Sequence, residues 1–304
     1  MKVSTTNEYG KLHSVIVGRA ENMSWPTDDQ EFNRAMSRST YPGTLIRGQV
    51  PEQVIKEATE DLSRLSDEMQ GRGIDVYRPT TGAPHWSYSA RDIILTVGDL
   101  VIQCPTPFTS RKNELRLYPF LENADCKLIK APTVTNSDDP CFDAANVLKM
   151  DDKLLYSLSH SANEAGAVWL QEQVGTEFEV IPWRAVKHHI THVDSTLLSL
   201  RKNTIMVNAS RVHEDDLPGF MKDYEKIWVD DVRPRDFVGF PYSSRWIGMN
   251  VLSLDPETVI VDEIQLELTE QLRSHNFNVI GLPMRQSRTL GGGFHCVTCD
   301  IERY

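Results

Sequence analysis

The sequence has few cysteines, and their spacing does not suit a disulfide framework or a structural metal site. Five cysteines are spread over 304 residues, and only Cys296 and Cys299 lie close together. A structural zinc site usually needs two further ligands at similar short spacing, and the chain has no second close pair of cysteines. We therefore predict no metal. The odd number of scattered cysteines predicts reduced thiols and a cytoplasmic setting.

Cationic residues are scarce relative to anionic ones. The chain has 32 Lys and Arg against 43 Asp and Glu, which gives a formal net charge of −11 at pH 7. Nucleic acids and anionic membranes both reward clustered cations, so this balance argues against either as the main partner. The same charge is compatible with a small cationic substrate.

The sequence also lacks long apolar runs. No stretch approaches the roughly 20 apolar residues that span a bilayer, and the first nine residues contain no apolar segment for export. Hydrophobic residues nevertheless make up 40% of the chain, which is enough for a large core. These features predict a soluble cytoplasmic protein that does not bind a membrane.

Predicted strands and helices recur in a common order along the chain. Hairpins are predicted at 91–102, 141–156, 195–208 and 246–261, and single strands at 14–17, 74–77, 127–130, 178–181, 226–229 and 278–280. Apolar residues at helical spacing predict helices over 51–71, 163–174, 217–224 and 263–275. The many hairpins favour a mixed α/β fold over a doubly wound parallel sheet. The polar segment 19–50 is longer than a connection requires, so we expect it to cover a site.

The last fifteen residues direct the functional interpretation. They begin with Leu290 and three glycines, which disfavour a helix or an ordinary strand and permit a loop with unusual backbone angles. His295 and Cys296 follow at once, which is typical of a loop that presents a nucleophilic thiol to a base elsewhere in the chain. A redox Cys-x-x-Cys is disfavoured so far from the start of a βαβ unit. Two buried structural thiols are the alternative, especially for Cys299.

Candidate partners for the thiol lie in three other segments. His192 and Asp194 stand at the start of a predicted strand, where the period of two puts both side chains on one face. Such a pair suits a general base beside a substrate-binding carboxylate, and a surface His with a solvated Asp is the alternative. Asp143 lies in the apolar run Cys-Phe-Asp-Ala-Ala, where a carboxylate normally needs a partner such as a catalytic His. Asp92 follows Arg91, and pairing with a neighbouring charge is its simplest interpretation.

Together these motifs resemble the amidinotransferase family. The resemblance is carried by Gly-Gly-Gly-Phe-His-Cys-x-Thr-Cys-Asp near the C-terminus, Cys-Phe-Asp-Ala-Ala and His-x-Asp-Ser-Thr, and it extends to residues 7–22, 90–95 and 243–251. It covers nearly the whole chain in order. It implies one catalytic domain over residues 1–304 with the pentein fold, a five-bladed α/β-propeller of strand–strand–helix–strand modules around a central site.

The resemblance also implies a role for each of eight residues. Cys296 matches the nucleophile, His192 the general acid and base, and Asp143 the carboxylate that assists the histidine. Asp92 and Asp194 match the pair that binds a planar guanidinium group. The other three match an arginine that holds the carboxylate of the donor and two serines of the same pocket, namely Arg211, Ser243 and Ser244.

The implied reaction moves the amidino group of L-arginine to a primary amine through a covalent amidino-cysteine and releases L-ornithine. No cofactor is implied, and the expected partners are these small molecules and, in addition, a second copy of the chain in a homodimer. Glycine is the first acceptor predicted. Asn146 and Val297 stand where glycine-using animal enzymes have Asp and Trp, which keeps an amino-cyclitol or another amine open as acceptor. A deiminase that forms citrulline and ammonia and a non-enzymatic guanidino-binding protein are the alternatives.

Overall fold

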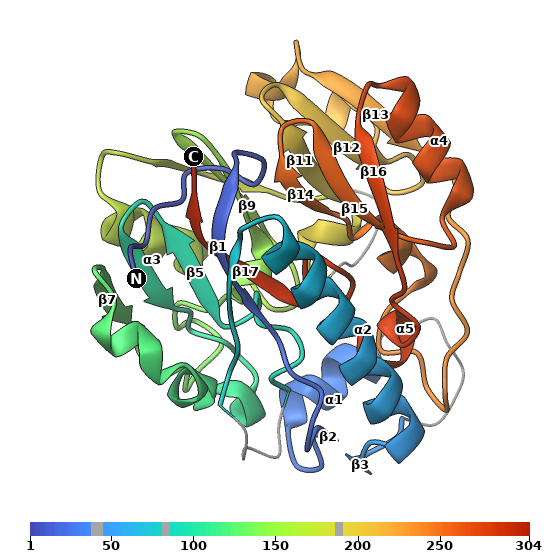
Figure 1. The fold of residues 1–304 in the computed structure, drawn as a ribbon. Helices are drawn as coiled ribbons and strands as arrows, with labels where there is room; N and C mark the ends of the chain where they lie inside the picture. The colour runs from blue at the N-terminus through green and yellow to red at the C-terminus, as the bar shows by residue number, and fades with distance from the viewer. Residues whose placement is uncertain (38–44, 81–85, 186–190) are drawn as a thin grey trace.

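The computed structural model describes residues 1–37, 45–80, 86–185 and 191–304, and it has the predicted mixed α/β fold (Figure 1). Its main feature is a set of five three-stranded sheets in these described parts. In four of them the first two strands form an antiparallel hairpin, and the third strand pairs in parallel with the second. These four sheets are β5 (Ile94–Val97), β6 (Leu100–Gln103) and β7 (Lys127–Lys130); β8 (Val147–Met150), β9 (Lys153–Ser157) and β10 (Glu179–Trp183); β11 (Leu197–Arg201), β12 (Thr204–Asn208) and β13 (Glu225–Val229); β14 (Leu252–Asp255), β15 (Thr258–Asp262) and β16 (Asn278–Leu282).

The fifth sheet joins the two ends of the chain. Strand β1 (Leu12–Val17) pairs in parallel with β4 (Asp75–Tyr77) and antiparallel with the C-terminal strand β17 (Thr298–Arg303). The last strand therefore takes the place that a hairpin partner takes in the other sheets, and in Figure 1 the C-terminus lies at the end of this strand while the N-terminus lies near β5 and β7. This pairing holds the loop before β17, which carries Cys296, against the N-terminal segment.

Turn chemistry explains why the hairpins form where the sequence predicts. Three of the turns contain a residue with positive φ, namely Gly98 (58°), Asp151 (61°) and Asn203 (57°). Gly, Asp and Asn tolerate this left-handed conformation better than other residues, and it matches the twist of paired strands. The predicted turning points at 98–99 and 202–203 and the Asp-Asp turn near 151 are confirmed.

Helices connect the second and third strands in three of the five sheets. They are α2 (Glu52–Gly71), α3 (Glu164–Val174) and α4 (Leu266–Ser274), and each confirms a predicted helix. Helix α2 buries the stripe of apolar residues that predicted it, namely Val54, Ala58, Leu62, Leu65 and Met69. The predicted helix over 217–224 is wrong. Only a 3-10 turn forms there, at Gly219–Met221, where Gly219 lowers the helix propensity of an already short segment.

The segment 19–50 contains short elements of its own in the described residues. A two-stranded sheet joins β2 (Ser24–Trp25) to β3 (Gly48–Gln49), and α1 (Gln30–Ser37) lies between them, while residues 38–44 lie outside the described part. Asp29 anchors α1, because its Oδ1 accepts the backbone N–H of Phe32 and its Oδ2 accepts the N–H and hydroxyl of Ser110. Phe32 and Trp25 pack in the same apolar cluster as α2.

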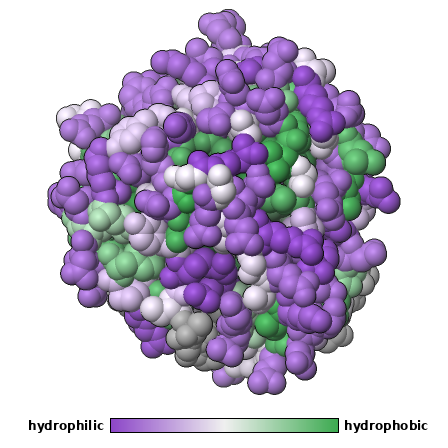
Figure 2. Space-filling model, in the orientation of Figure 1, coloured by the Kyte–Doolittle hydropathy of each residue, from purple (hydrophilic) through white to green (hydrophobic). Residues whose placement is uncertain are grey.

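Neighbouring sheets contact one another through their first strands. Strand β17 contacts β5, β8 contacts β11, and β11 contacts β14. These are contacts that a ring of five sheets requires, and the closed five-bladed propeller itself stays a prediction. None of the described helices is both long enough and apolar enough to cross a membrane. The face drawn in Figure 2 is mostly hydrophilic, with apolar side chains in small separate patches.

Candidate active site

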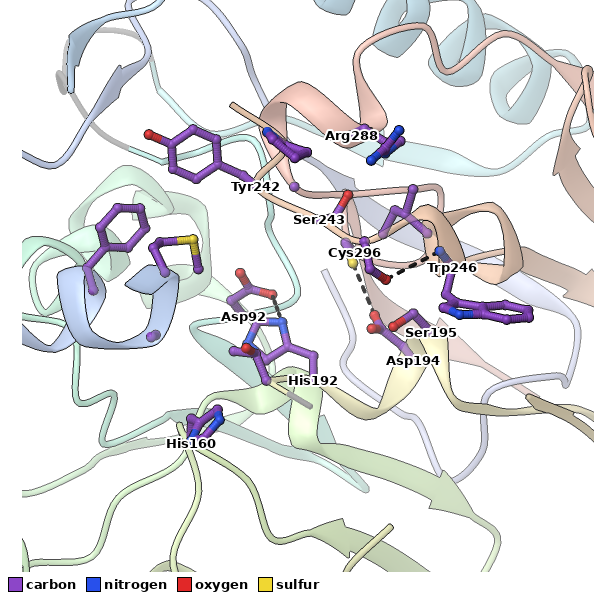
Figure 3. A pocket seen from close by; sticks show the side chains of 18 of the residues that line it. Asp92, His160, His192, Asp194, Ser195, Tyr242, Ser243, Trp246, Arg288 and Cys296 are labelled. Carbon is purple, nitrogen blue, oxygen red and sulfur yellow. Dashed lines mark hydrogen bonds and ion pairs between the residues drawn. The ribbon is translucent and has the colours of Figure 1, made fainter. Parts of the chain in front are cut away.

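A cavity of about 610 Å³ brings together most of the residues singled out from the sequence. Figure 3 shows the acidic, imidazole and thiol side chains pointing into a common space. Seven of the eight predicted site residues line the cavity, namely Asp92, His192, Asp194, Arg211, Ser243, Ser244 and Cys296. Asp143 does not line it and lies fully buried behind His192. The segment 19–50 contributes Pro26, Phe32, Ala35 and Met36 to the wall, as its length predicted.

The glycine-rich loop places Cys296 through a backbone that bulkier residues could not adopt. Gly291 ends the short helix α5 (Ser287–Leu290) with a left-handed φ of 81°. At Gly293 an added Cβ would lie 2.7 Å from the Cβ of Asn250, so the two backbones approach too closely for a side chain. Asn250 then holds the loop, because its Oδ1 accepts the backbone N–H of Cys296 at 2.9 Å. Its Nδ2 donates to the backbone oxygen of Asp194 at 3.2 Å.

Asp194 lies directly beside the thiol. The Sγ–H of Cys296 donates to Oδ2 of Asp194 at 3.2 Å, and Nδ1 of His295 lies 3.0 Å from the same oxygen. Burial opposes the charged form of Asp194, but the hydrogen bond and charge of His295 and the charge of His192 lower its pKa to about 2. Asp194 is therefore ionised at neutral pH in a position to bind a cation.

His192 and Asp143 form a close pair. Nε2 of His192 lies 3.0 Å from Oδ2 of Asp143, while Nδ1 of His192 lies 3.7 Å from Oδ1 of Asp92. Burial opposes protonation of His192, but the charges of Asp92 and Asp143 outweigh it and raise its pKa to about 9. The imidazole of His192 is therefore protonated on both nitrogens and positively charged at neutral pH.

The local structure around His192 differs from the prediction. His192 and Asp194 do not start a strand, because a 3-10 turn over Val193–Ser195 precedes β11 and is closed by the hydrogen bond from Thr196 N to Val193 O. Both side chains still face the cavity, so the shared face arises from the turn and not from the period of a strand.

Asp92 is held by a buried ion pair with Arg111, and its other oxygen lies 3.7 Å from Nδ1 of His192. Its Oδ2 accepts a hydrogen bond from Arg111, which also binds Glu114 at 2.9 Å. Its Oδ1 accepts no hydrogen bond from any described residue. Burial raises the pKa of Asp92 against the opposing charges of His192 and Arg111. A bound cation would stabilise the ionised form of the buried Asp92, since it would pair with the remaining oxygen.

The nucleophile candidate is protonated in this state. Burial, followed by the charges of Asp194 and Asp92, raises the pKa of the Cys296 thiol well above its usual value. The thiol lines the same cavity as His192, Asp92 and Asp194. The thiol needs a nearby positive charge before it can act as a thiolate.

Arg211 lies on another part of the wall without an acidic partner. Its guanidinium donates to Ser195 O, Ser195 Oγ, Thr196 Oγ1 and Ser244 Oγ at 2.8–3.2 Å, and no described carboxylate forms an ion pair with it. Burial lowers the pKa of Arg211 to about 10. A buried guanidinium bound only to neutral oxygens is suited to receive an anionic group of a ligand.

One wall of the cavity is aromatic. Phe32 packs edge-on against Trp86 at 5.5 Å between ring centroids and lies 5.8 Å from Tyr242, which it meets in a stacked arrangement. Met36 and Phe108 extend this surface. The wall offers an apolar face to a ligand next to the acidic side chains.

Sequence reasoning missed four residues that shape the site. Glu8, Asn250 and His295 occur within the segments that carry the family resemblance, but no role was predicted for them. Arg111 gave no signal in a single sequence, since only folding brings it near Asp92. Asn146, whose effect on the acceptor was left open, is fully buried and binds Ser159 and Ser161.

The other cysteines lie apart from the site. Cys299 is buried in a separate apolar cluster, where its thiol donates to Ile94 O at 3.4 Å, as expected for a structural thiol. Within the described ranges, no group of three His, Cys, Asp or Glu side chains is arranged to hold a metal ion.

Comparisons with known proteins agree with this geometry. No protein-family model matches the chain. Inosamine-phosphate amidinotransferase 1 from Streptomyces griseus is 36% identical over 337 aligned positions, which cover 99% of this chain and 97% of the relative. A solved structure of inosamine-phosphate amidinotransferase from the same organism has a TM-score of 0.92, 36% identity and the same coverage of both chains.

More distant relatives extend the comparison. A mitochondrial glycine amidinotransferase from Xenopus tropicalis is 26% identical, with 99% of this chain and 83% of the relative covered. The N-terminal domain of a cyanobacterial arginine dihydrolase has a TM-score of 0.71 at 13% identity, with 96% of this chain and 98% of that domain covered, which shows a shared fold alone. These structures confirm the predicted α/β fold, while its closure into five blades stays a prediction. With 36% identity across almost the full length of both chains, this protein belongs to the amidinotransferase family.

Proposed function

We propose that this protein transfers the amidino group of L-arginine to the primary amine of an amino-cyclitol phosphate through a covalent amidino group on Cys296. One observation carries the proposal. A single cavity is lined by a buried thiol, a histidine that Asp143 contacts from behind, two carboxylates and an arginine, Arg211, that has no acidic partner among the described residues.

The guanidinium of the donor binds between Asp92 and Asp194. A guanidinium is planar, permanently charged and presents its N–H donors as a fork, so two carboxylates can bind and orient it. Oδ1 of Asp92 accepts no other hydrogen bond from the described residues, and Asp194 is ionised. Arg211 receives the carboxylate of the donor, which explains why a buried cation is surrounded only by neutral oxygens.

Binding of the donor activates the nucleophile. The thiol of Cys296 is protonated in the empty site because of burial and of the charges of Asp194 and Asp92. The bound guanidinium places a positive charge between these carboxylates and the sulfur, which lowers the pKa of the thiol. The thiol then loses its proton to solvent, and the resulting thiolate attacks the central guanidinium carbon and forms a tetrahedral adduct.

His192 then moves the protons. Its Nε2 is held by Asp143, so the proton that it can give to the ligand is the one on Nδ1. As the bond from carbon to the ornithine nitrogen breaks, that nitrogen takes this proton, and a cationic amidino group remains on the sulfur. The acceptor amine attacks the same carbon, gives a proton to Nδ1, and expels the thiolate. Asp143 orients the ring and stabilises its charged form, as the carboxylate of a catalytic triad does.

The shape of the cavity supports a ring-bearing acceptor. A volume of about 610 Å³ lies within the range of sites for ligands much larger than glycine. The aromatic wall of Phe32, Trp86 and Tyr242 suits the C–H face of a saturated ring. Arg245 and Arg288 line the same cavity and are suited to a phosphate group. The 36% identical relatives that are named for inosamine phosphate agree with this choice.

An acceptor screen tests the proposal. The purified protein is incubated with arginine alone and with glycine, lysine or an inosamine phosphate, and ornithine, citrulline and the amidinated product are measured. We expect ornithine only when an amine is present, with the highest kcat/KM for the inosamine phosphate. Citrulline formed from arginine alone would show a hydrolase, and equal or greater kcat/KM for glycine would refute the acceptor.

A further inference from the structure

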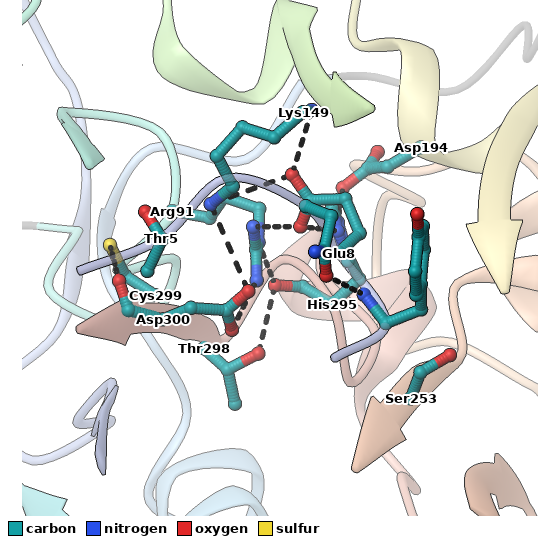
Figure 4. Close-up of polar contacts among 12 residues, drawn as sticks. Thr5, Glu8, Arg91, Lys149, Asp194, Ser253, His295, Thr298, Cys299 and Asp300 are labelled. Carbon is teal, nitrogen blue, oxygen red and sulfur yellow. Dashed lines mark hydrogen bonds and ion pairs between the residues drawn. The ribbon is translucent and has the colours of Figure 1, made fainter. Parts of the chain in front are cut away.

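A buried network of charges lies directly behind the active site (Figure 4). His295 stands at its centre, with Nδ1 3.0 Å from Oδ2 of Asp194 and Nε2 3.3 Å from Oε2 of Glu8. Glu8 in turn pairs with Arg91 at 3.0 Å and Lys149 at 3.5 Å. All five side chains are buried, so their interactions are weakly screened by water.

The geometry indicates the protonation state of His295. Both carboxylates that it meets are ionised, since the pKa of Asp194 is about 2 and Lys149, Arg91 and His295 hold the pKa of Glu8 well below its usual value against the cost of burial. An ionised carboxylate can only accept hydrogen bonds, and a neutral imidazole has a hydrogen on one nitrogen only. Contacts at both ring nitrogens are satisfied only when both carry a proton.

The backbone fixes the ring in this place. Arg91 donates from Nε to the backbone oxygen of His295 at 2.8 Å, and the backbone N–H of His295 points toward Asn250 O at 3.4 Å. The imidazole is thus held by its main chain and at both ring nitrogens. The residue that follows it is Cys296, so its charge stands next to both the thiol and the carboxylate to which the thiol donates.

We propose that His295 and Glu8 are positioning residues of the reaction. Glu8 keeps His295 in the doubly protonated form, and this imidazolium orients Asp194 and offsets its negative charge beside Cys296. Neither residue touches the substrate. The inference rests on the proposed function for its effect on turnover, but the protonation state of His295 can be measured whether or not that function is correct.

The chain offers a matched control for Glu8. Asp300 belongs to the same buried network and pairs with Arg91 at 3.1 Å and with Lys149 at 3.8 Å, but it does not contact His295. Glu8→Gln and Asp300→Asn each remove one buried carboxylate from these two cations. Only Glu8→Gln removes the carboxylate that faces the imidazole.

The first measurement is the protonation of His295. Nitrogen NMR of 15N-histidine-labelled protein is recorded from pH 6 to pH 9, and the His295 signals are assigned with His295→Asn. We expect both ring nitrogens to be protonated at neutral pH in the wild type and in Asp300→Asn. In Glu8→Gln, the Nε2 nitrogen should carry less proton occupancy than in Asp300→Asn at the same pH, because its acceptor is no longer charged.

The second measurement is the rate at which iodoacetamide alkylates Cys296. In His295→Asn, the amide retains a donor toward Asp194 but has no charge, so the thiol pKa should rise. An opposite charge at this range typically shifts a pKa by 1 unit or more, which predicts about tenfold slower alkylation at a given pH. In Glu8→Gln, alkylation of Cys296 should be slowed to the same extent at the pH values where His295 is neutral. In Asp300→Asn, the alkylation rate should equal that of the wild type.

Three results would overturn the inference. A wild-type His295 with one proton at neutral pH would do so without any variant, even if Glu8→Gln fails to fold. Identical titration of His295 in Glu8→Gln and Asp300→Asn would show that Glu8 only neutralises Lys149 and Arg91. Unchanged alkylation in His295→Asn would show that the imidazole has no effect on the thiol. Failure of amidino transfer in the wild type would refute the proposed function and leave these results standing.

Discussion

The Sγ atom of Cys296 lies 3.2 Å from Oδ2 of Asp194, although the two residues are 102 positions apart in the chain. The carboxylate that would attract a guanidinium is therefore the same group that keeps the thiol protonated while the site is empty. The arrangement delays formation of a reactive thiolate until a cation arrives, because the thiol pKa stays raised in the empty site despite the nearby imidazoles and an added positive charge lowers it.

Removal of the Asp194 charge should make the resting thiol more acidic. The negative charges of Asp194 and Asp92 contribute to the raised thiol pKa, so Asp194→Asn should lower it and speed alkylation at neutral pH by about tenfold. Alkylation rates measured from pH 6 to pH 10 give the thiol pKa directly. The exposed Asp215→Asn serves as control and should match the wild type. An unchanged profile in Asp194→Asn would show that this carboxylate does not act on the thiol.

Cys296→Ala should abolish turnover and leave the protein folded, because it removes the atom that carries the amidino group. Mass spectrometry of acid-quenched protein with arginine should show the amidino adduct in the wild type and none in the variant. Cys299→Ala is the matched control, since its thiol lies in a separate apolar cluster. That variant should remain active and lose about 1–2 kcal/mol of stability from the deleted sulfur. An adduct in Cys296→Ala would contradict the assignment.

The His192–Asp143 pair should set the alkaline limit of the reaction. The pKa of His192 is about 9, so donor turnover should fall as the pH rises through about 9 and the general acid loses its proton. Asp143→Asn removes a group that raises this pKa, so the limit should move to lower pH by about one unit or more. A kcat profile with an identical alkaline limb in the variant would argue against the pair.

The same pair predicts how stability depends on pH. The folded pKa of His192 lies above its unfolded value of about 6.5. The stabilisation that protonated His192 adds to the folded state is therefore complete below about pH 6.5. It is lost as the pH rises through about 9. The difference in free energy of unfolding between wild type and Asp143→Asn should shrink over this window, as measured by urea denaturation at several pH values.

Arg211→Gln should weaken binding of arginine but not of agmatine, which has the guanidinium and lacks the carboxylate. The loss of one charge-assisted contact is about 1.5–3 kcal/mol, or roughly a 10- to 150-fold rise in KM for arginine. Asp92→Asn is the contrasting variant and should raise KM for both compounds, since it acts on the guanidinium. Equal effects of Arg211→Gln on arginine and agmatine would place Arg211 elsewhere in the reaction.

Gly293→Ala should reduce activity strongly, because the added Cβ would lie 2.7 Å from Asn250 and push the nucleophile loop away from Asp194. We expect kcat to fall about 100-fold, as a displacement near 1 Å of reacting groups can cause. Gly219→Ala is the control, since no atom lies within 4 Å of the added Cβ there. Comparable activity in the two variants would show that the loop tolerates a side chain at 293.

Local pattern was sufficient for most of the secondary structure. The stripe of α2 and the hairpin turns at Gly98 and Asn203 depend on near neighbours in the chain, which a sequence displays. The same reasoning failed where short elements compete. At residues 217–224 only one 3-10 turn forms in place of a helix, and at 193–195 a turn replaces the start of a strand.

By itself, the sequence determined the kinds of residue that do the chemistry, their order, and the family to which the chain belongs. Only the tertiary structure decided which charges surround the thiol. Glu8 and His295 are 287 positions apart and Asp194 and His295 are 101 apart, yet each pair meets in a buried space. The reason is physical, because electrostatic effects on a pKa depend on distance and burial in the folded protein and not on order along the chain.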